Sequence, residues 1–192
     1  MYKMADILSP KEMGNFKIDY FEIGENPSFY AIRQGIPKGK YTRLYVNGEL
    51  AMSDTPMERR TNSFITQNAF GDILIGGLGL GMILLEIQGN DKVNSITVIE
   101  KHPEVIEIVG RQLPLNNKVK IIEGDIFTYK PERKYDLIWL DIWNSVNSDV
   151  YKEEMKPLKA KYRRYLKSKS ENHERKVTCW AEWEAKNDRR LI

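Results

Sequence analysis

Residues 72–81 read Asp-Ile-Leu-Ile-Gly-Gly-Leu-Gly-Leu-Gly, a short apolar run that ends in glycines and leads into an apolar stretch from Leu80 to Ile87. This order predicts a strand, a glycine-rich turn and a helix. Glycines at positions 76, 77, 79 and 81 let the backbone approach a ligand, and the start of the helix offers unpaired N–H groups. The segment therefore predicts a site for a nucleotide-like ligand.

Short apolar runs alternate with helix-like stretches after residue 72. Pro103 and Glu104 suit the first turn of a helix that reaches Leu113. Strands this short and apolar, separated by helices, imply a parallel sheet with both faces covered. We expect a doubly wound, Rossmann-like α/β domain over residues 61–192, shortened after its fourth or fifth strand because only residues 141–192 follow the fourth. The expected strands are Ile73–Ile75, Ile96–Ile99, Val119–Ile122 and Leu137–Leu140.

Residues 1–60 have a different, β-rich character. Apolar residues alternate at Phe16, Ile18 and Tyr20, and Asn47-Gly48 separates two strand-like runs, which is a strong hairpin signal. We interpret residues 16–53 as an antiparallel meander, with the aromatic run Phe29–Ile32 as one of its strands. This segment forms an appendage to the α/β domain.

The chain from about residue 148 is charged and helical in pattern. Met155, Leu158, Tyr162 and Tyr165 share one helix face, and Pro157 indicates either a kink or a new helix start. Residues 177–183 fit a fifth strand by alternation or a helix by the spacing of their tryptophans, and we favour the helix.

The net charge of +3 conceals an asymmetry between the two ends of the chain. Residues 151–192 carry 13 Lys and Arg against 7 Asp and Glu, whereas residues 1–150 carry 17 against 20. A basic segment of this kind can bind nucleic acid or can form a solvated helix face. Nucleic acid would be held by Lys159, Lys161, Arg163 and Arg164.

Composition excludes several other classes of protein. The N-terminus lacks the pattern of a signal peptide and no stretch is long enough to span a membrane, so we expect a cytoplasmic protein without membrane contact. The single cysteine, Cys179, is interpreted as a packed residue. With only His102 and His173 beside it, no metal-ligand spacing exists.

Three acidic residues follow the ends of predicted strands. Glu100 lies 19 positions beyond Gly81, where a doubly wound sheet presents an acid to ribose hydroxyls, and Asp125 and Asp141 follow the next two strands. Because the carboxyl ends of parallel strands line one crevice, these acids should converge on the glycine loop.

These residues resemble the class I S-adenosylmethionine-dependent methyltransferases, and within them the spermidine synthase-like branch. The resemblance runs from Leu44 to Asn144 through LYVNGELAMSD, DILIGGLGLG, ITVIEKHPEVIEIV, VKIIEGDIF and KYDLIWLDIW. It implies S-adenosylmethionine as cofactor, with the glycine loop at its methionine part, Glu100 at the ribose, and Asp125 with the Ile126 backbone at the adenine. It also makes a homodimer possible. The implied cofactor-binding set is Gly76, Gly77, Leu78, Gly79, Gly81, Glu100, Lys101, Asp125, Ile126 and Asp141.

The chain departs from the spermidine synthase pattern where that pattern binds a diamine. Leu80 stands in the loop where the spermidine synthase pattern has an acid. Ala51 and Thr55–Arg60 correspond to upstream polar residues of that pattern, and after the fourth strand only Asp141 remains of its two acids. A dication in such a pocket would lack counter-charges, so a polyamine substrate is disfavoured. Trp143 and Asn144 are the candidate substrate residues, and Asp141 is the candidate base.

The sequence thus predicts a methyltransferase whose acceptor it does not identify. Three alternatives remain open: an aminopropyltransferase, a non-catalytic S-adenosylmethionine-binding or nucleic-acid-associated protein, and a dinucleotide-binding dehydrogenase. The dehydrogenase is disfavoured because the loop reads G-G-L-G-L-G rather than G-x-G-x-x-G.

Overall fold

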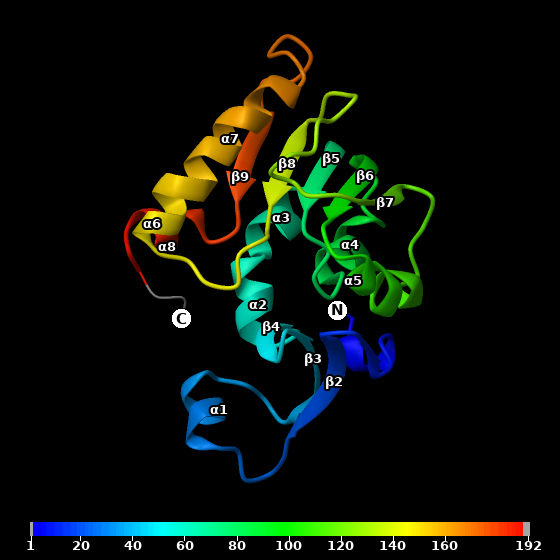
Figure 1. Cartoon of the computed structure of the whole chain (residues 1–192), viewed down its shortest axis with the longest axis vertical. Coiled ribbons are helices and arrows are strands. Elements are labelled where there is room, and N and C mark those ends of the chain that lie inside the picture. The colour runs from blue at the N-terminus through cyan, green and yellow to red at the C-terminus, as the bar shows by residue number, and fades with distance from the viewer. Residues whose placement is uncertain (1, 190–192) are drawn as a thin grey trace.

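Two β-sheets organise the chain, a parallel one formed by its C-terminal two-thirds and an antiparallel one near its N-terminus (Figure 1). The computed structural model describes residues 2–189, apart from the side chain of Tyr30. The parallel sheet has the order β7-β6-β5-β8-β9. The chain adds β6 and then β7 on one side of β5, and it adds β8 and then β9 on the other side. Its strands are β5 (Gly71–Gly76), β6 (Val93–Glu100), β7 (Val119–Glu123), β8 (Leu137–Leu140) and β9 (Lys176–Cys179).

Side chains of the central strands alternate between two apolar cores. Ile73, Ile75 and Trp139 pack in the first core, on the side of α4 (Met82–Ile87) and α5 (Pro103–Ile108). Leu74 and Ile138 pack in the second core, which includes residues of α7 (Lys156–Tyr162). Both faces of the sheet are therefore covered, which confirms the predicted α/β fold (Figure 1).

The N-terminal sheet has four antiparallel strands in sequence order. Asn47 and Gly48, with φ of 54° and 79°, connect β3 to β4 and confirm the predicted hairpin, because this two-residue turn needs positive φ at both positions. The predicted strand at Phe29–Ile32 is wrong. Ser28 Oγ accepts the Ala31 N–H and caps a short helix there. The elements are β1 (Lys11–Met13), β2 (Phe16–Ile23), α1 (Phe29–Arg33), β3 (Gly39–Val46) and β4 (Glu49–Ser53).

Helices α2 (Pro56–Thr61) and α3 (Ser63–Asn68) lead from the N-terminal sheet into β5 (Figure 1). Helix α2 crosses residue 60, where we expected the appendage to end, so a domain boundary at that residue stays a prediction. No helix of residues 2–189 is long and apolar enough to span a membrane.

The C-terminal segment begins with α6 (Ser148–Val150) and a π-helical turn, Tyr151–Met155, that leads directly into α7. Pro157 lies in the first turn of α7, but Met155 and Lys156 before it already have helical backbone angles, so the helix does not start afresh at the proline. The wider π-helical turn before Pro157 accommodates the missing N–H donor of the proline.

The helix favoured for residues 177–183 is wrong for its first half. Residues 177–179 pair with β8 as the outer strand β9, and Val177 and Cys179 are buried on one face. The helix α8 (Glu182–Lys186) starts only after Ala181, whose φ of 49° ends the extended segment.

Candidate active site

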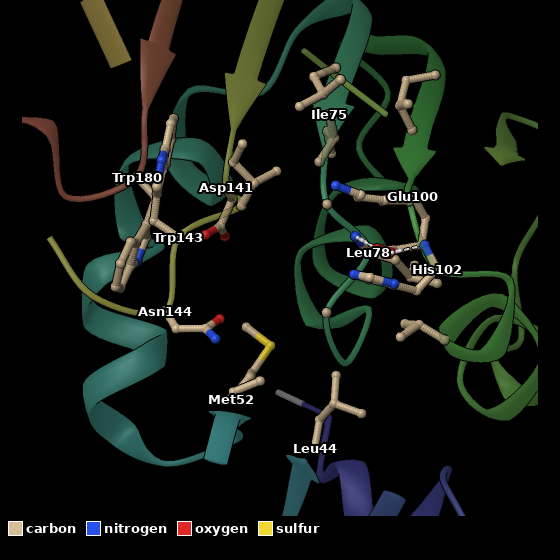
Figure 2. Close-up of a pocket in the computed structure, with 18 of the residues that line it drawn as sticks. Leu44, Met52, Ile75, Leu78, Glu100, His102, Asp141, Trp143, Asn144 and Trp180 are labelled. Atoms are coloured by element: carbon tan, nitrogen blue, oxygen red, sulfur yellow. Dashed lines mark hydrogen bonds between the residues drawn. The ribbon is translucent and has the colours of Figure 1, made fainter. Parts of the chain in front are cut away.

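A cavity of about 340 Å³ lies at the carboxyl edge of the parallel sheet and reaches the N-terminal sheet. One side, which we call the loop wall, comprises the turns after β5, β6 and β7. The opposite side, the helix wall, comprises α2, the turn after β8 and Trp180. Leu44, Val46, Ala51 and Met52 of the N-terminal sheet form the floor. Figure 2 shows Glu100 and Leu78 facing Asp141 and Trp143 across this space, with Met52 between the walls.

The glycine loop is shaped by contacts within the protein. Gly77 has a φ of +96°, and a Cβ there would lie 2.1 Å from the Asp141 carbonyl oxygen. Gly79 has a φ of +52°, and a Cβ there would meet Met52 Sδ at 2.5 Å. Met52 Sδ also accepts the Leu80 N–H at 3.2 Å. The sequence suggested that these glycines let a ligand approach the backbone. The structure adds a second reason, which is close contact with other parts of the protein.

Two predicted loop residues lie outside the cavity lining. Gly76 ends β5 beneath the loop, and Gly81 packs against Leu113, which a Cβ would approach to 2.3 Å. Leu80 is fully buried and does not line the cavity, whereas Gly79 does. The identity of residue 80 therefore gives no information about what the cavity binds.

Glu100 projects from the end of β6 and is only 6% exposed. Its Oε2 accepts the Leu78 N–H at 2.8 Å and its Oε1 accepts the His102 N–H at 2.9 Å. These bonds fix the carboxylate against the glycine loop. Each oxygen keeps acceptor capacity for a hydroxyl, since a carboxylate offers about four lone-pair sites.

Asp125 follows β7 on the same wall. Its Oδ1 accepts the Phe127 N–H at 2.8 Å, and its Oδ2 pairs with Lys101 Nζ at 3.0 Å. The Phe127 N–H, followed by Lys101, holds the pKa of Asp125 below its usual value, so this side chain is ionised at neutral pH. The next residue, Ile126, is buried, and together with Phe127 it forms an apolar surface of the cavity.

Asp141 is the first residue after β8, where its N–H donates to the Gly76 carbonyl oxygen at 2.8 Å. Its side chain opens to the cavity from the helix wall (Figure 2). Burial raises the pKa of Asp141 to about 7, and the Trp139 side chain opposes this shift only in part. Asp141 is therefore poised to exchange a proton near neutral pH.

Glu58 of α2 also lines the cavity, and the sequence analysis did not identify it. Burial, and then the negative charge of Asp141, raises the pKa of Glu58 to about 8. The resemblance had placed the stretch Thr55–Arg60 at the substrate side and treated its acids as lost, but Glu58 lies within that stretch and does reach the cavity. The cavity thus carries two acids on each wall.

Trp143 and Asn144, the predicted substrate residues, extend the helix wall toward the floor (Figure 2). Trp143 Nε1 donates to Glu154 Oε2 at 2.7 Å, so the π-helical turn fixes the indole ring. Trp180, which follows β9, lies on the same side of the cavity. Of the predicted site residues, ten line the cavity: Gly77, Leu78, Gly79, Glu100, Lys101, Asp125, Ile126, Asp141, Trp143 and Asn144.

Two of the four cations predicted to bind nucleic acid contact the protein instead. Lys159 pairs with Glu182, and Lys161 Nζ donates to the Phe127 carbonyl oxygen at 2.7 Å. Nucleic acid binding stays a prediction, and residues 190–192 of the basic segment lie outside the described residues.

Comparison with known proteins gives matches at the level of structure alone. No family model matches the chain, and no curated protein matches it. Spermidine synthase from Thermotoga maritima is 17% identical with a TM-score of 0.50, and the match covers 83% of this chain and 52% of that one.

Two methyltransferases match over shorter stretches. The N-methyltransferase NodS from Bradyrhizobium japonicum WM9, in complex with S-adenosyl-L-homocysteine, is 16% identical with a TM-score of 0.46, covering 59% of each chain. The glycopeptide N-methyltransferase MtfA, complexed with S-adenosyl-L-methionine, is 13% identical with a TM-score of 0.46, covering 63% of this chain and 48% of that one. The chain therefore spans about half the length of these structures.

The spermidine synthase match includes most of the chain, and the parallel sheet has β5 at the point where strand order reverses. Ligands of such sheets bind outside the carboxyl ends of the strands, which is where the cavity lies. The chain has a Rossmann-like α/β fold similar to that of the Thermotoga maritima spermidine synthase.

Proposed function

We propose that this chain is an S-adenosylmethionine-dependent methyltransferase. The observation that carries the proposal is the cavity itself, in which a glycine loop and a buried carboxylate on one wall face a titratable carboxylate on the other. S-Adenosylmethionine supplies an activated methyl group, so the protein has only to orient the acceptor and, where needed, take a proton.

The loop wall suits this cofactor in three respects. Glu100 keeps acceptor capacity for the ribose hydroxyls, and Ile126 with Phe127 offers an apolar surface for the adenine. Gly77 and Gly79 leave main chain rather than side chains at the surface beside the methionine part.

Asp141 has the position and the pKa of a general base. It opens to the cavity opposite the glycine loop, and burial raises its pKa to about 7. Trp143 and Asn144 beside it would orient the acceptor. Asp141→Asn should therefore abolish methyl transfer to an acceptor that must lose a proton, while cofactor binding remains.

Calorimetric titration of the full chain with S-adenosylmethionine and S-adenosylhomocysteine tests the proposal. We expect both to bind, and Glu100→Gln to weaken them. Glu123→Gln is the matched control, since Glu123 is exposed at the end of β7 and does not line the cavity. Absence of binding by the folded protein at millimolar ligand would exclude the proposed function.

The alternatives require different outcomes. Aminopropyl transfer requires product from decarboxylated S-adenosylmethionine and putrescine. We expect none, because Glu58 and Asp141 would serve one ammonium group together and leave the second without a carboxylate. A non-catalytic binding protein would bind the cofactor but support no transfer to any acceptor.

Action on nucleic acid requires association that weakens steeply as the salt concentration rises, which we test with a duplex oligonucleotide. A homodimer is tested by sedimentation.

A further inference from the structure

Glu58 and Asp141 form a pair of carboxylates without a cation. Both line the helix wall, and they are close enough for the charge of one to raise the pKa of the other. Neither has an ion-pair partner within residues 2–189. The neighbouring Arg59 is already paired, through its Nη1, with Glu86 Oε1 at 3.1 Å.

The other basic side chains of the lining do not pair with these two acids. Lys101 and His102 belong to the opposite wall together with Glu100 and Asp125, and Lys101 pairs with Asp125. Enclosed carboxylates without a counter-charge raise the free energy of the folded chain unless they bind protons or a cation. Protons neutralise the pair at low pH, and a bound cation can take their place as the pH rises.

We propose, on the basis of the proposed function, that the methyl acceptor is an amine with a single positive charge, whose ammonium group binds between Glu58 and Asp141. An ammonium group has three N–H donors, enough to serve both carboxylates at once. Trp143 and Trp180 lie on the same side of the cavity as Asp141, and Met52 lines the floor, so apolar and aromatic surface is close to the pair. The rest of the acceptor therefore has an apolar or aromatic body.

One charge suits this pair better than two. Glu58 and Asp141 lie on the same wall, and the charge of Asp141 raises the pKa of Glu58, so the two carboxylates are neighbours that one ammonium group can serve together. The second ammonium group of a diamine would enter a helix wall whose remaining lining is apolar or uncharged, apart from the pair itself.

The same pair provides the route for the proton. The ammonium nitrogen gives one proton to a carboxylate of the pair and so regains its lone pair. That lone pair forms the new bond to the methyl carbon, while the carbon–sulfur bond breaks and its electron pair stays on sulfur. The product leaves as a protonated secondary amine, and the pair releases its proton to solvent.

Binding of simple probes to the full chain tests the proposal independently of turnover. We would titrate phenethylamine, its neutral analogue 2-phenylethanol and 1,4-diaminobutane at pH 8.5, with and without S-adenosylhomocysteine, and follow heat and tryptophan fluorescence. Phenethylamine should bind at least tenfold more tightly than 2-phenylethanol and than 1,4-diaminobutane. Its affinity should fall at least fivefold between pH 8.5 and pH 6, as the pair takes up protons.

Glu58→Gln should reduce the preference for amine over alcohol by about tenfold and flatten its pH dependence, with the affinity for S-adenosylhomocysteine changed less than twofold. Glu49→Gln is the matched control, because Glu49 is exposed on β4 and lies outside the cavity lining. Equal binding of amine and alcohol by the wild-type chain, or an unchanged preference in Glu58→Gln, would overturn the proposal. Loss of the proposed function is recognised separately, by the absence of S-adenosylhomocysteine binding in the wild-type chain.

Discussion

The two walls of the cavity each carry two acids, and the two pairs are in opposite states. On the loop wall, Glu100 accepts two backbone N–H groups and Asp125 pairs with Lys101. On the helix wall, Glu58 and Asp141 have no cation, and their pKa values are raised. Acids held by backbone N–H groups and a cation keep a fixed geometry, whereas acids without a cation remain available for a ligand or a proton. The difference separates a wall suited to holding the cofactor from a wall suited to the acceptor.

The largest effect is expected where the two walls touch, at Gly77. Gly77→Ala places a methyl group against the Asp141 carbonyl oxygen and forces alanine to a φ of +96°. Positive φ costs about 1–2 kcal/mol, and the collision with main chain raises the total loss of unfolding free energy to about 3 kcal/mol or more. Urea denaturation measures this loss.

Gly14→Ala is the control for backbone strain alone. Gly14 has a φ of +57°, and nothing lies within 4 Å of the position that a Cβ would take. It should lose about 1 kcal/mol. Equal losses in the two variants would mean that the contact between the walls contributes nothing, and that they can separate freely.

The second prediction removes the charge from the loop wall. Glu100→Gln should weaken S-adenosylhomocysteine binding about 30-fold, because hydrogen bonds to a charged acceptor contribute about 2 kcal/mol. Glu58→Gln should leave the same affinity within twofold. Calorimetry measures the affinity of both variants for S-adenosylhomocysteine, with Glu123→Gln as the control. A comparable loss of affinity in Glu58→Gln would contradict the division of roles between the walls.

Sequence alone was sufficient for the loop wall and insufficient for the helix wall. The glycine loop, Glu100 and Asp125 follow strand ends, and the topology of a parallel sheet brings strand ends together without any knowledge of side-chain packing. Glu58 belongs to α2, outside the strand-helix rhythm, and its meeting with Asp141 depends on how the chain enters β5. The alternation of strands and helices gives no sign of this contact, and the resemblance, which placed Thr55–Arg60 at the substrate side, was used only to judge which acids are missing.

The errors in secondary structure have similar causes. Residues 29–32 have strand-like composition, but one side-chain cap from Ser28 is enough to favour a short helix at an exposed site. Residues 177–179 form a strand because β8 offers an unpaired edge, which is a property of the sheet and not of the segment. Local propensity is decisive in neither case.

The third prediction concerns pH and the cost of the unpaired acids. Between its usual pKa of 4.5 and its folded pKa of about 8, Glu58 is protonated in the folded chain and ionised in the unfolded chain, so stability falls as the pH rises through this range. Glu58→Gln removes this dependence. The variant should gain at least about 1 kcal/mol relative to the wild type between pH 5 and pH 9, measured by urea denaturation.

Glu49→Gln serves again as the control, since Glu49 is exposed and should show the same pH profile as the wild type. A Glu58→Gln profile that runs parallel to the wild-type profile would mean that Glu58 is ionised in the folded chain, and the contrast between the walls would then disappear.

The smallest effect is expected at Glu154, which acts on the helix wall through Trp143. Glu154→Gln retains an acceptor oxygen but weakens the charge-assisted bond from Trp143 Nε1, at a cost of about 0.5–1 kcal/mol in unfolding free energy. If the π-helical turn holds the indole ring as part of the acceptor site, the variant should also bind phenethylamine a few-fold more weakly, with unchanged affinity for S-adenosylhomocysteine. Glu153→Gln, one residue away on the exposed side of the same turn, is the matched control. A loss of cofactor affinity in Glu154→Gln would instead mean that Trp143 serves both walls, and the acceptor could then not be assigned to one of them.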